Sequence, residues 1–203
     1  MTRWTRVASA GAAVALVTSL IPMFATARHA VVADANDANG VLDIRRVEMV
    51  SARTRWKVIS WRRWTAEAMW DRGFTLVYLD TFGGSRADYY VRVGSNGRRI
   101  SGVLYRDAER GKDRRIRSVR VRHPSGKVVT VTVPLSKVTR RDSGVYGWYV
   151  LTLFSGVKCR RVCIDRAPDS GAVTEPGPQP TPSVPSPTIT PTVTPTPTPT
   201  AGR

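Results

Sequence analysis

The stretch RSVRVRHPSGKVVTVTV, residues 117–133, decides the fold class of this chain. In its first half Val119 and Val121 alternate with Arg120 and Arg122, and in its second half valine alternates with threonine. A period of two residues indicates a strand with one buried and one solvent-facing side, and the intervening HPSG supplies turn residues. The stretch therefore predicts a β-hairpin whose outer face places Arg120 and Arg122 beside a row of threonines.

Further runs with strand-like patterns lie on both sides of this hairpin. They cover residues 41–50, 54–61, 74–80, 88–93, 102–105 and 145–154, with a short helix predicted over 61–70. Eight or so short strands separated by turns indicate an all-β fold, an antiparallel β-sandwich of the jelly-roll or immunoglobulin-like kind. Trp56 and Trp148 fall within two of these strands and are predicted to fill the core.

The N-terminal residues read as an export signal. Residues 1–27 contain Arg3 and Arg6, continue as an apolar run and end in Ala-Thr-Ala. This order predicts a signal peptide that is cleaved after Ala27. Cleavage after Ala33 and retention of the segment as an uncleaved membrane anchor are the alternatives.

The C-terminal residues have a different composition again. Over residues 169–203 proline alternates with threonine and serine, and aromatic residues are absent. Such a segment cannot bury a core, so it predicts a disordered, extended Pro/Thr-rich tail. The sandwich domain is thus predicted over residues 34–168, in a protein that is secreted and either extracellular or associated with the cell wall.

The chain has two cysteines, Cys159 and Cys163. Export exposes thiols to oxidising conditions, which favours a local disulfide that pins a small loop. The alternative is a zinc site, which would have to recruit His29 or His123 as further ligands.

The chain is strongly basic, with 32 Lys and Arg residues against 15 Asp and Glu residues and a net charge of +17. Such a charge favours anionic partners, here cell-wall polymers, acidic polysaccharide or lipid headgroups. Export makes the relevant polyanion extracellular, so no specific nucleic acid is expected, and any membrane contact is predicted to be peripheral. Arginines far outnumber lysines. A GC-rich coding bias also produces this skew, so incidental charge is the alternative.

Three tryptophans lie in the connection after the second predicted strand. Trp61, Trp64 and Trp70 are interspersed with arginines, a combination that could form an exposed surface for sugars or for a membrane interface. The alternative is a small satellite core beneath that loop.

Several motifs resemble a known class of module. They are DANDANGVLDI at 34–44, FTLVYLDT at 74–81, ADYYV at 87–91, VTVP at 131–134 and the late Trp148. Together they resemble uncharacterised secreted β-sandwich modules of high-GC Gram-positive bacteria, which are similar to DOMON-type and family-nine-like carbohydrate-binding domains. The resemblance spans roughly residues 34–168. It implies export and a sandwich architecture, and it implies no known activity.

Members of that class that read LDTDGD could hold Ca²⁺, which takes roughly six to eight oxygen ligands. This chain reads LDTFGG at residues 79–84, so Phe82 and Gly84 stand where those carboxylates would be. These two replacements remove two carboxylate ligands from the calcium site that the class could form. Calcium therefore stays only a weak candidate, and no other cofactor is expected.

The remaining calcium candidates are Asp80 and Asp88, joined by Asp37 or Asp43 if the acidic opening of the domain lies near them. The alternative interpretation is structural. Asp80 then ends one strand, the two glycines form a turn, and Asp88 accepts backbone hydrogen bonds at the start of the next strand.

No catalytic constellation is recognisable. A serine triad would need His123 or His29, and Asp142-Ser143-Gly144 lacks the flanking glycine pattern of a nucleophile elbow. The sequence therefore predicts a non-catalytic binding module that engages anionic envelope polymers or polysaccharide through Arg120, Arg122 and the three tryptophans. A structural or protein-interaction module of the cell wall is the alternative, followed by an enzyme acting on wall polymers.

Overall fold

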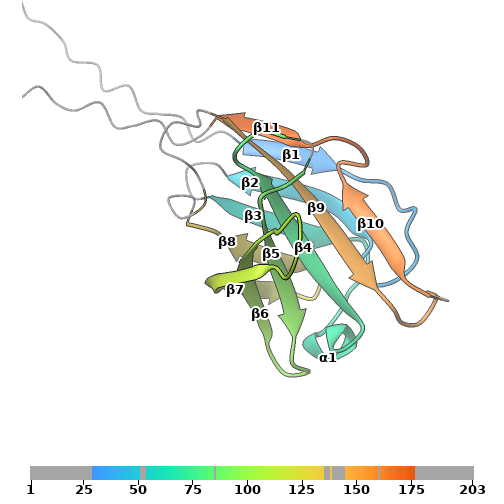
Figure 1. Cartoon of the computed structure of the whole chain (residues 1–203). Coiled ribbons are helices and arrows are strands. Elements are labelled where there is room, and N and C mark those ends of the chain that lie inside the picture. Colours follow the sequence, from blue (N-terminus) through green and yellow to red (C-terminus); the bar gives the residue numbers. More distant parts are fainter. Residues whose placement is uncertain are drawn as a thin grey trace, which may run out of the picture.

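The computed structural model describes residues 29–50, 54–84, 86–134, 138, 145–159 and 161–176. Eleven strands and one short helix form in the order shown in Figure 1: β1 (His29–Ala33), β2 (Ile44–Val50), β3 (Arg55–Ser60), α1 (Ala66–Met69), β4 (Gly73–Asp80), β5 (Tyr89–Ser95), β6 (Ile100–Arg106), β7 (Arg114–Ser125), β8 (Val128–Thr132), β9 (Val145–Phe154), β10 (Cys163–Ala167) and β11 (Val173–Pro176). The all-β, antiparallel fold class predicted from the sequence is confirmed.

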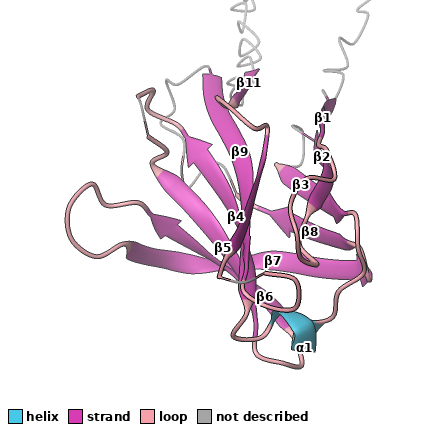
Figure 2. Ribbon diagram, turned by 90° about the vertical axis from the view of Figure 1, so that its right-hand side faces the viewer, coloured by secondary structure: helices cyan, strands magenta, loops and turns pink. Residues whose placement is uncertain are grey.

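The strands form one antiparallel ladder that folds into two layers. The order is β1-β2-β3-β8-β7-β6-β5-β4-β9-β10, and β11 adds to β9. Figure 2 shows β1, β2, β3 and β8 on one side and the layer containing β4, β5 and β9 on the other. We call the first layer sheet A and the second sheet B. The sheet nearly closes, because β10 approaches β2 across the far end of the sandwich.

The long strand β7 belongs to both layers. Its residues 114–119 pair with β6 in sheet B, whereas its residues 120–125 pair with β8 in sheet A. A strand that bends from one sheet into the other turns a corner of the sandwich. The first strand of the predicted hairpin therefore pairs with strands of both sheets. Arg120 and Arg122 lie in the part of β7 that belongs to sheet A.

Two tryptophans from opposite layers meet in the core. Trp56 of β3 and Trp148 of β9 are both fully buried, with ring centroids 6.4 Å apart and an interplanar angle of 75°. Edge-to-face packing of this kind suits the quadrupoles of two aromatic rings. The prediction that both residues fill the core is confirmed.

The hairpin turn is shorter than predicted. The sequence assigned residues 123–126 to the turn, but β7 continues to Ser125, which pairs with Val128. Gly126 and Lys127 alone make the turn. The register shifts between Arg122 and Ser125, and this irregularity accommodates Pro124, which has no N–H to donate to the ladder.

The helix is also shorter than the predicted 61–70. The backbone N–H of Trp64 donates to the Gly126 carbonyl at 2.8 Å, so this residue is tied to the hairpin turn rather than to a helix. Thr65 caps α1, because its Oγ1 accepts a hydrogen bond from the Ala68 N–H at 3.1 Å. Within the described chain, no helix has the length and apolar character that crossing a bilayer requires.

Strands also form outside the residues assigned to the sandwich domain. β1 precedes residue 34, and β11 lies inside the segment 169–203 assigned to the tail. β1 pairs with β2 along its whole length, and β11 pairs with the first residues of β9. The predicted signal peptide, residues 1–27, and residues 177–203 of the predicted tail lie outside the described residues.

Candidate anion-binding surface

The outer face of sheet A carries a cationic surface that three strands build together. Alternation places Arg55 of β3 and Arg120 of β7 on either side of Thr132 of β8, because both pair with that threonine. Two residues further along the same two strands, Arg122 of β7 pairs with Thr130 of β8. We call these five residues the arginine face. They line a shallow hollow of about 80 Å³.

The arginine face is electrostatically distinct from its neighbours on the same sheet. Beside it, Glu48 contacts Arg46 at 2.7 Å and Lys57 at 3.0 Å. Partial burial tends to raise the pKa of Glu48, but the hydrogen bond and charge of Lys57, with the charge of Arg46, lower it overall. Glu48 thus offsets part of the charge of those two cations. In the described part of the chain, none of the three arginines of the arginine face has an acidic partner.

The spacing of these groups suits an extended anion. One strand, β8, lies between Arg55 and Arg120, so two inter-strand spacings put their backbones about 10 Å apart, and Arg120 and Arg122 are about 7 Å apart along β7. A guanidinium offers a planar fork of donors that matches carboxylate or phosphate oxygens. The threonine hydroxyls between them can donate as well. The surface can therefore hold several anionic groups of one polymer.

The predicted tryptophan surface does not form a single platform. Trp64 is buried, with its ring stacked on His123 at 4.0 Å and its indole N–H donating to Ser60 Oγ at 3.1 Å. It therefore belongs to the core of the sandwich. Trp61 is partly buried, donates to the Ala35 carbonyl at 3.0 Å and lies under the Arg45 guanidinium.

Trp70 is the exposed member of the three, with 51% of its surface accessible. It follows α1 directly, and its ring lies against Gly97 in the β5–β6 turn. The structure therefore separates the three tryptophans into one core residue, one partly covered residue and one exposed residue. None of them joins Arg120 and Arg122 in the arginine face.

Asp80 and Asp88 lie at the two ends of the turn between β4 and β5, and both carboxylates accept hydrogen bonds from backbone N–H groups of that turn. Asp88 Oδ2 accepts from the N–H groups of Thr81 at 2.7 Å and Phe82 at 2.9 Å. Asp80 Oδ1 accepts from the Gly83 N–H at 2.9 Å, and Gly83 has a φ of 71°, which favours glycine. This is the structural arrangement that the sequence offered as the alternative to calcium.

A second group of carboxylates meets where β10 approaches β2. Asp165 Oδ2 accepts from the Ile44 N–H at 2.5 Å and thereby joins the two strands. Asp43 is buried, and among the described residues neither of its carboxylate oxygens has a hydrogen-bond partner. Burial, reinforced by Asp165, raises the pKa of Asp43 to about 6. Burial and the charge of Asp165 also raise the pKa of Asp34.

These carboxylates bear on the calcium prediction. Asp43 gathers with Asp34 and Asp165, whereas Asp80 and Asp88 are engaged in the β4–β5 turn. Across the described ranges, no three His, Cys, Asp or Glu side chains are grouped so as to hold a metal ion.

Cys159 and Cys163 form a disulfide between β9 and β10, as predicted, with their Cα atoms 5.5 Å apart. Its sulfur Cys159 Sγ lies 3.1 Å from the Asn39 carbonyl oxygen. The disulfide therefore fixes the β9–β10 connection next to the loop that leads into β2.

The outer face of sheet B carries a ladder of four tyrosines that the sequence did not single out. Tyr105, Tyr90, Tyr78 and Tyr149 are cross-strand neighbours on β6, β5, β4 and β9. Adjacent ring centroids are 5.1, 5.6 and 4.6 Å apart, and the Arg166 guanidinium covers Tyr149 at 4.3 Å. The rings face one another, so the ladder offers ring edges and hydroxyls rather than free faces for stacking.

Burial within this ladder changes the acidity of its hydroxyls. It raises the pKa of Tyr78 to about 12, with the neighbouring Tyr149 as the next cause. Burial also raises the pKa of Tyr90, whose hydroxyl donates to Asp113 Oδ2 at 2.7 Å. These hydroxyls therefore stay protonated at neutral pH and act as hydrogen-bond donors.

Sequence reasoning found Arg120 and Arg122 but missed Arg55 as a member of the arginine face. The local signal was present, because Arg55 and Lys57 alternate with the buried Trp56 and Val58 in β3. The missing information was the pairing of β3 with β8, which joins residues far apart in the chain.

No protein-family model matches this chain, and neither a curated protein nor a solved structure matches it. The resemblance to DOMON-type and family-nine-like domains therefore stays a prediction.

Proposed function

We propose that this protein is an exported, non-catalytic module that binds anionic envelope polymers or acidic polysaccharide through the arginine face. The observation that carries the proposal is the set of three arginines, Arg55, Arg120 and Arg122, which surround Thr130 and Thr132 without an acidic partner in the described chain. Guanidinium and hydroxyl groups bind anions by charge-assisted hydrogen bonds. Arginine stays protonated at working pH, so this set suits binding rather than proton transfer.

Two further features support a polymer as the ligand. The arginines belong to two strands, β3 and β7, that flank the threonines of β8, so their guanidinium groups offer several separate positions to the anionic groups of one chain. The predicted export makes wall polymers and polysaccharides the polyanions that the protein meets. Incidental charge remains the competing account, and it predicts no preference for the arginine face.

Co-sedimentation tests the proposal. The exported protein would be mixed with isolated envelope material, and with soluble acidic and neutral polysaccharides, over a series of salt concentrations. Parallel samples would contain calcium or a chelator. We expect retention on anionic material that weakens steeply as salt rises. Absence of retention at low salt would reject the proposal and direct the search to a protein partner.

A further inference from the structure

A second surface, on another part of the molecule, gathers exposed apolar side chains. Val157 and Val162 in the connection between β9 and β10 are 75% and 52% exposed, and Ile164 in β10 is 58% exposed. They lie within ten residues of one another, and the Cys159–Cys163 disulfide lies among them and closes the loop that carries Val162. Single exposed apolar residues are ordinary on protein surfaces, but a cluster held by a covalent link indicates a contact surface.

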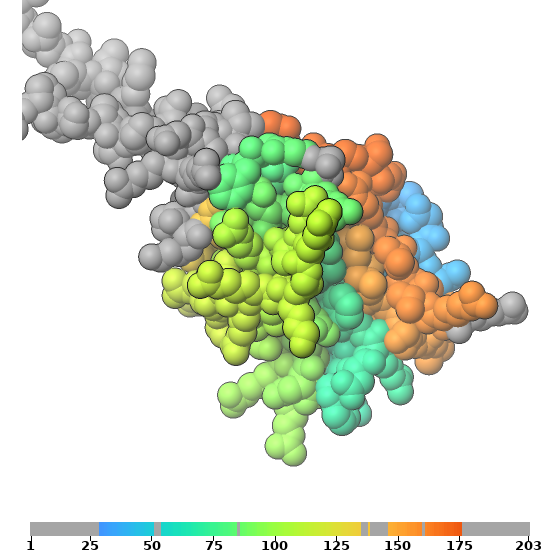
Figure 3. Space-filling view, in the orientation of Figure 1, coloured from blue at the N-terminus to red at the C-terminus, as the bar shows by residue number. Residues whose placement is uncertain are grey.

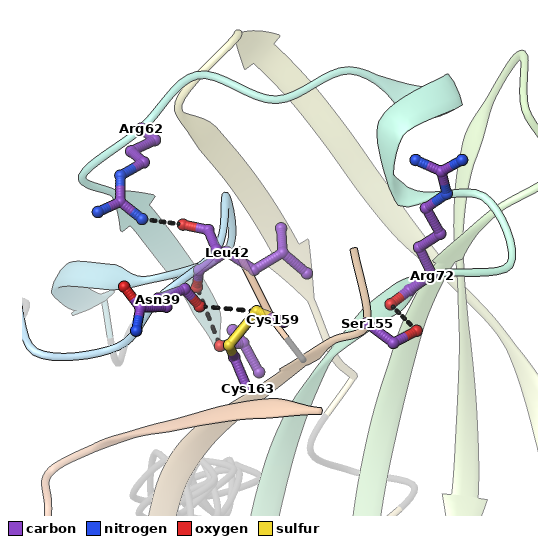
Figure 4. Close-up of a disulfide and its surroundings, with 9 residues drawn as sticks. Asn39, Leu42, Arg62, Arg72, Ser155, Cys159 and Cys163 are labelled. Atoms are coloured by element: carbon purple, nitrogen blue, oxygen red, sulfur yellow. Dashed lines mark hydrogen bonds between the residues drawn. A yellow bond between two sulfur atoms is a disulfide. The ribbon is translucent and has the colours of Figure 1, made fainter. Parts of the chain in front are cut away.

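Trp70 lies at the same end of the sandwich. The turn after α1 is tied to the β9–β10 connection, because the Ser155 N–H and hydroxyl both donate to the Arg72 carbonyl, at 2.6 and 3.1 Å (Figure 4). A hollow of about 400 Å³ lies between the turn after α1 and the β9–β10 connection. Met69, Phe74, Leu153 and Val162 are among its lining residues. Figure 3 shows the teal α1 region and the orange β9–β10 region next to each other at the lower right.

We call this surface the α1 end; it comprises Trp70, Val157, Val162, Ile164 and the charged residues around them. The exposed cations are Arg72, Arg92, Arg98, Arg99, Lys158 and Arg161, and the exposed acids on α1 and the turn after it are Glu67 and Asp71. Arg98 and Arg99 belong here because the Trp70 ring lies against Gly97. The Arg92 guanidinium stands over the Phe74 ring at 4.6 Å. Cations thus outnumber acids and are interspersed with the apolar side chains.

We propose that the α1 end docks on the surface of an anionic lipid bilayer. Trp70, Val157, Val162 and Ile164 enter the headgroup region, and the surrounding cations face lipid phosphates. Indole rings favour the interface between water and hydrocarbon. Short apolar protrusions combined with basic residues bind at that depth without spanning the membrane.

Charge complementarity favours a lipid surface over other occupants. A bilayer presents anionic groups and apolar chains across one continuous plane, which matches the cations and aliphatic side chains that are interspersed along residues 157–164. The proposal is independent of the polymer-binding function, because the α1 end and the arginine face share no residue.

Vesicle co-sedimentation tests the proposal on the protein released by cells that express the full chain. The probes are vesicles of phosphatidylcholine alone and vesicles in which roughly one lipid in four is phosphatidylglycerol. The test variant combines Val162→Ser and Ile164→Ser. The matched control is Val31→Ser on β1, because Val31 is also 58% exposed but lies on another strand.

We expect retention on the phosphatidylglycerol vesicles, weak retention on phosphatidylcholine alone, and about tenfold weaker retention for the double variant. Val31→Ser should behave as the unaltered protein. Tryptophan emission should shift to shorter wavelength on binding, and Trp70→Phe should abolish that shift. Three results would overturn the proposal: no retention on the anionic vesicles, equal retention of the double variant, or an equal loss in the Val31→Ser control.

Discussion

At the scale of single residues, Asp43 has the most unusual environment for its chemistry. It is 1% exposed, and neither carboxylate oxygen has a hydrogen-bond partner in the part of the chain that the structure describes. Burial and Asp165 raise the pKa of Asp43 to about 6 from an ordinary value of 3.8. The folded protein thus holds this proton more tightly than the unfolded chain does. The resulting stabilisation is complete below about pH 4 and is lost as the pH rises to about 6.

Asp43→Asn should therefore raise the free energy of unfolding at pH 8 by on the order of 1–3 kcal/mol, because the amide cannot acquire the buried charge. The gain should largely vanish at about pH 3, below the ordinary pKa of 3.8, where Asp43 is mostly protonated in both states. Urea unfolding at the two pH values measures both effects.

Asp113→Asn serves as the control, because it should lower the free energy of unfolding near neutral pH, where Asp43→Asn should raise it. The hydrogen bond from Tyr90 lowers the pKa of Asp113, so its stabilising effect is present near neutral pH and is lost as the pH falls. If Asp43→Asn were neutral or destabilising at pH 8, the carboxylate would have a compensating partner and the account of its environment would be wrong.

Glu48 has the opposite charge to the arginines beside it, and its carboxylate pairs with Arg46 and Lys57 next to the arginine face. Glu48→Gln should tighten binding to an acidic polysaccharide about threefold, since it frees two cations and removes a repulsive charge. Glu67→Gln on α1 changes the net charge equally and should leave affinity nearly unchanged. Equal effects from the two variants would attribute binding to net charge alone.

At the scale of elements, β7 determines the architecture because it passes from one layer to the other. Gly102 of β6 lies at this crossing, where a Cβ atom would come within 2.5 Å of Val121 Cγ2 and 2.9 Å of Val119 Cγ2. Both valines belong to β7 and flank Arg120. The absence of a side chain at residue 102 therefore allows β7 to cross closely over β6.

Gly102→Ala should lower the free energy of unfolding by about 1–3 kcal/mol, because the added methyl group overpacks this crossing. Gly94→Ala in β5 is the matched control, since nothing lies within 4 Å of its Cβ position. Alanine there should be neutral or slightly stabilising. Denaturant unfolding of both variants makes the comparison, and a tolerated Gly102→Ala would show that the crossing is not tightly packed.

The sequence predicted some elements well and others not at all, for identifiable reasons. β9 was predicted with its observed bounds of 145–154, because ten residues of strand-like pattern are a strong signal. β1, β10 and β11 have four or five residues each and lie near the predicted cleavage region, the disulfide and the tail. Segments that short carry too few alternations to be recognised, and their pairing with long strands decides their conformation.

At the scale of the whole molecule, the two outer faces of the sandwich differ in chemistry. Sheet A presents the arginine face, whereas sheet B presents the tyrosine ladder. The hairpin alternation predicted that Arg120 and Arg122 share an outer face. It could not predict that Arg55 joins them, because β3 and β8 are brought together only by long-range pairing. The same limit hid the tyrosine ladder, to which each strand contributes a single ring.

The most direct test of the polymer-binding proposal is the salt dependence of affinity for an acidic polysaccharide in two charge-matched double variants. Arg120→Gln with Arg122→Gln alters the sheet A part of β7, and Arg114→Gln with Arg115→Gln alters its sheet B part. Both variants lose the same net charge. We expect the first to weaken binding and to reduce the slope of log affinity against log salt by about two, and the second to change neither substantially. Equal losses in the two variants would contradict a role for the arginine face.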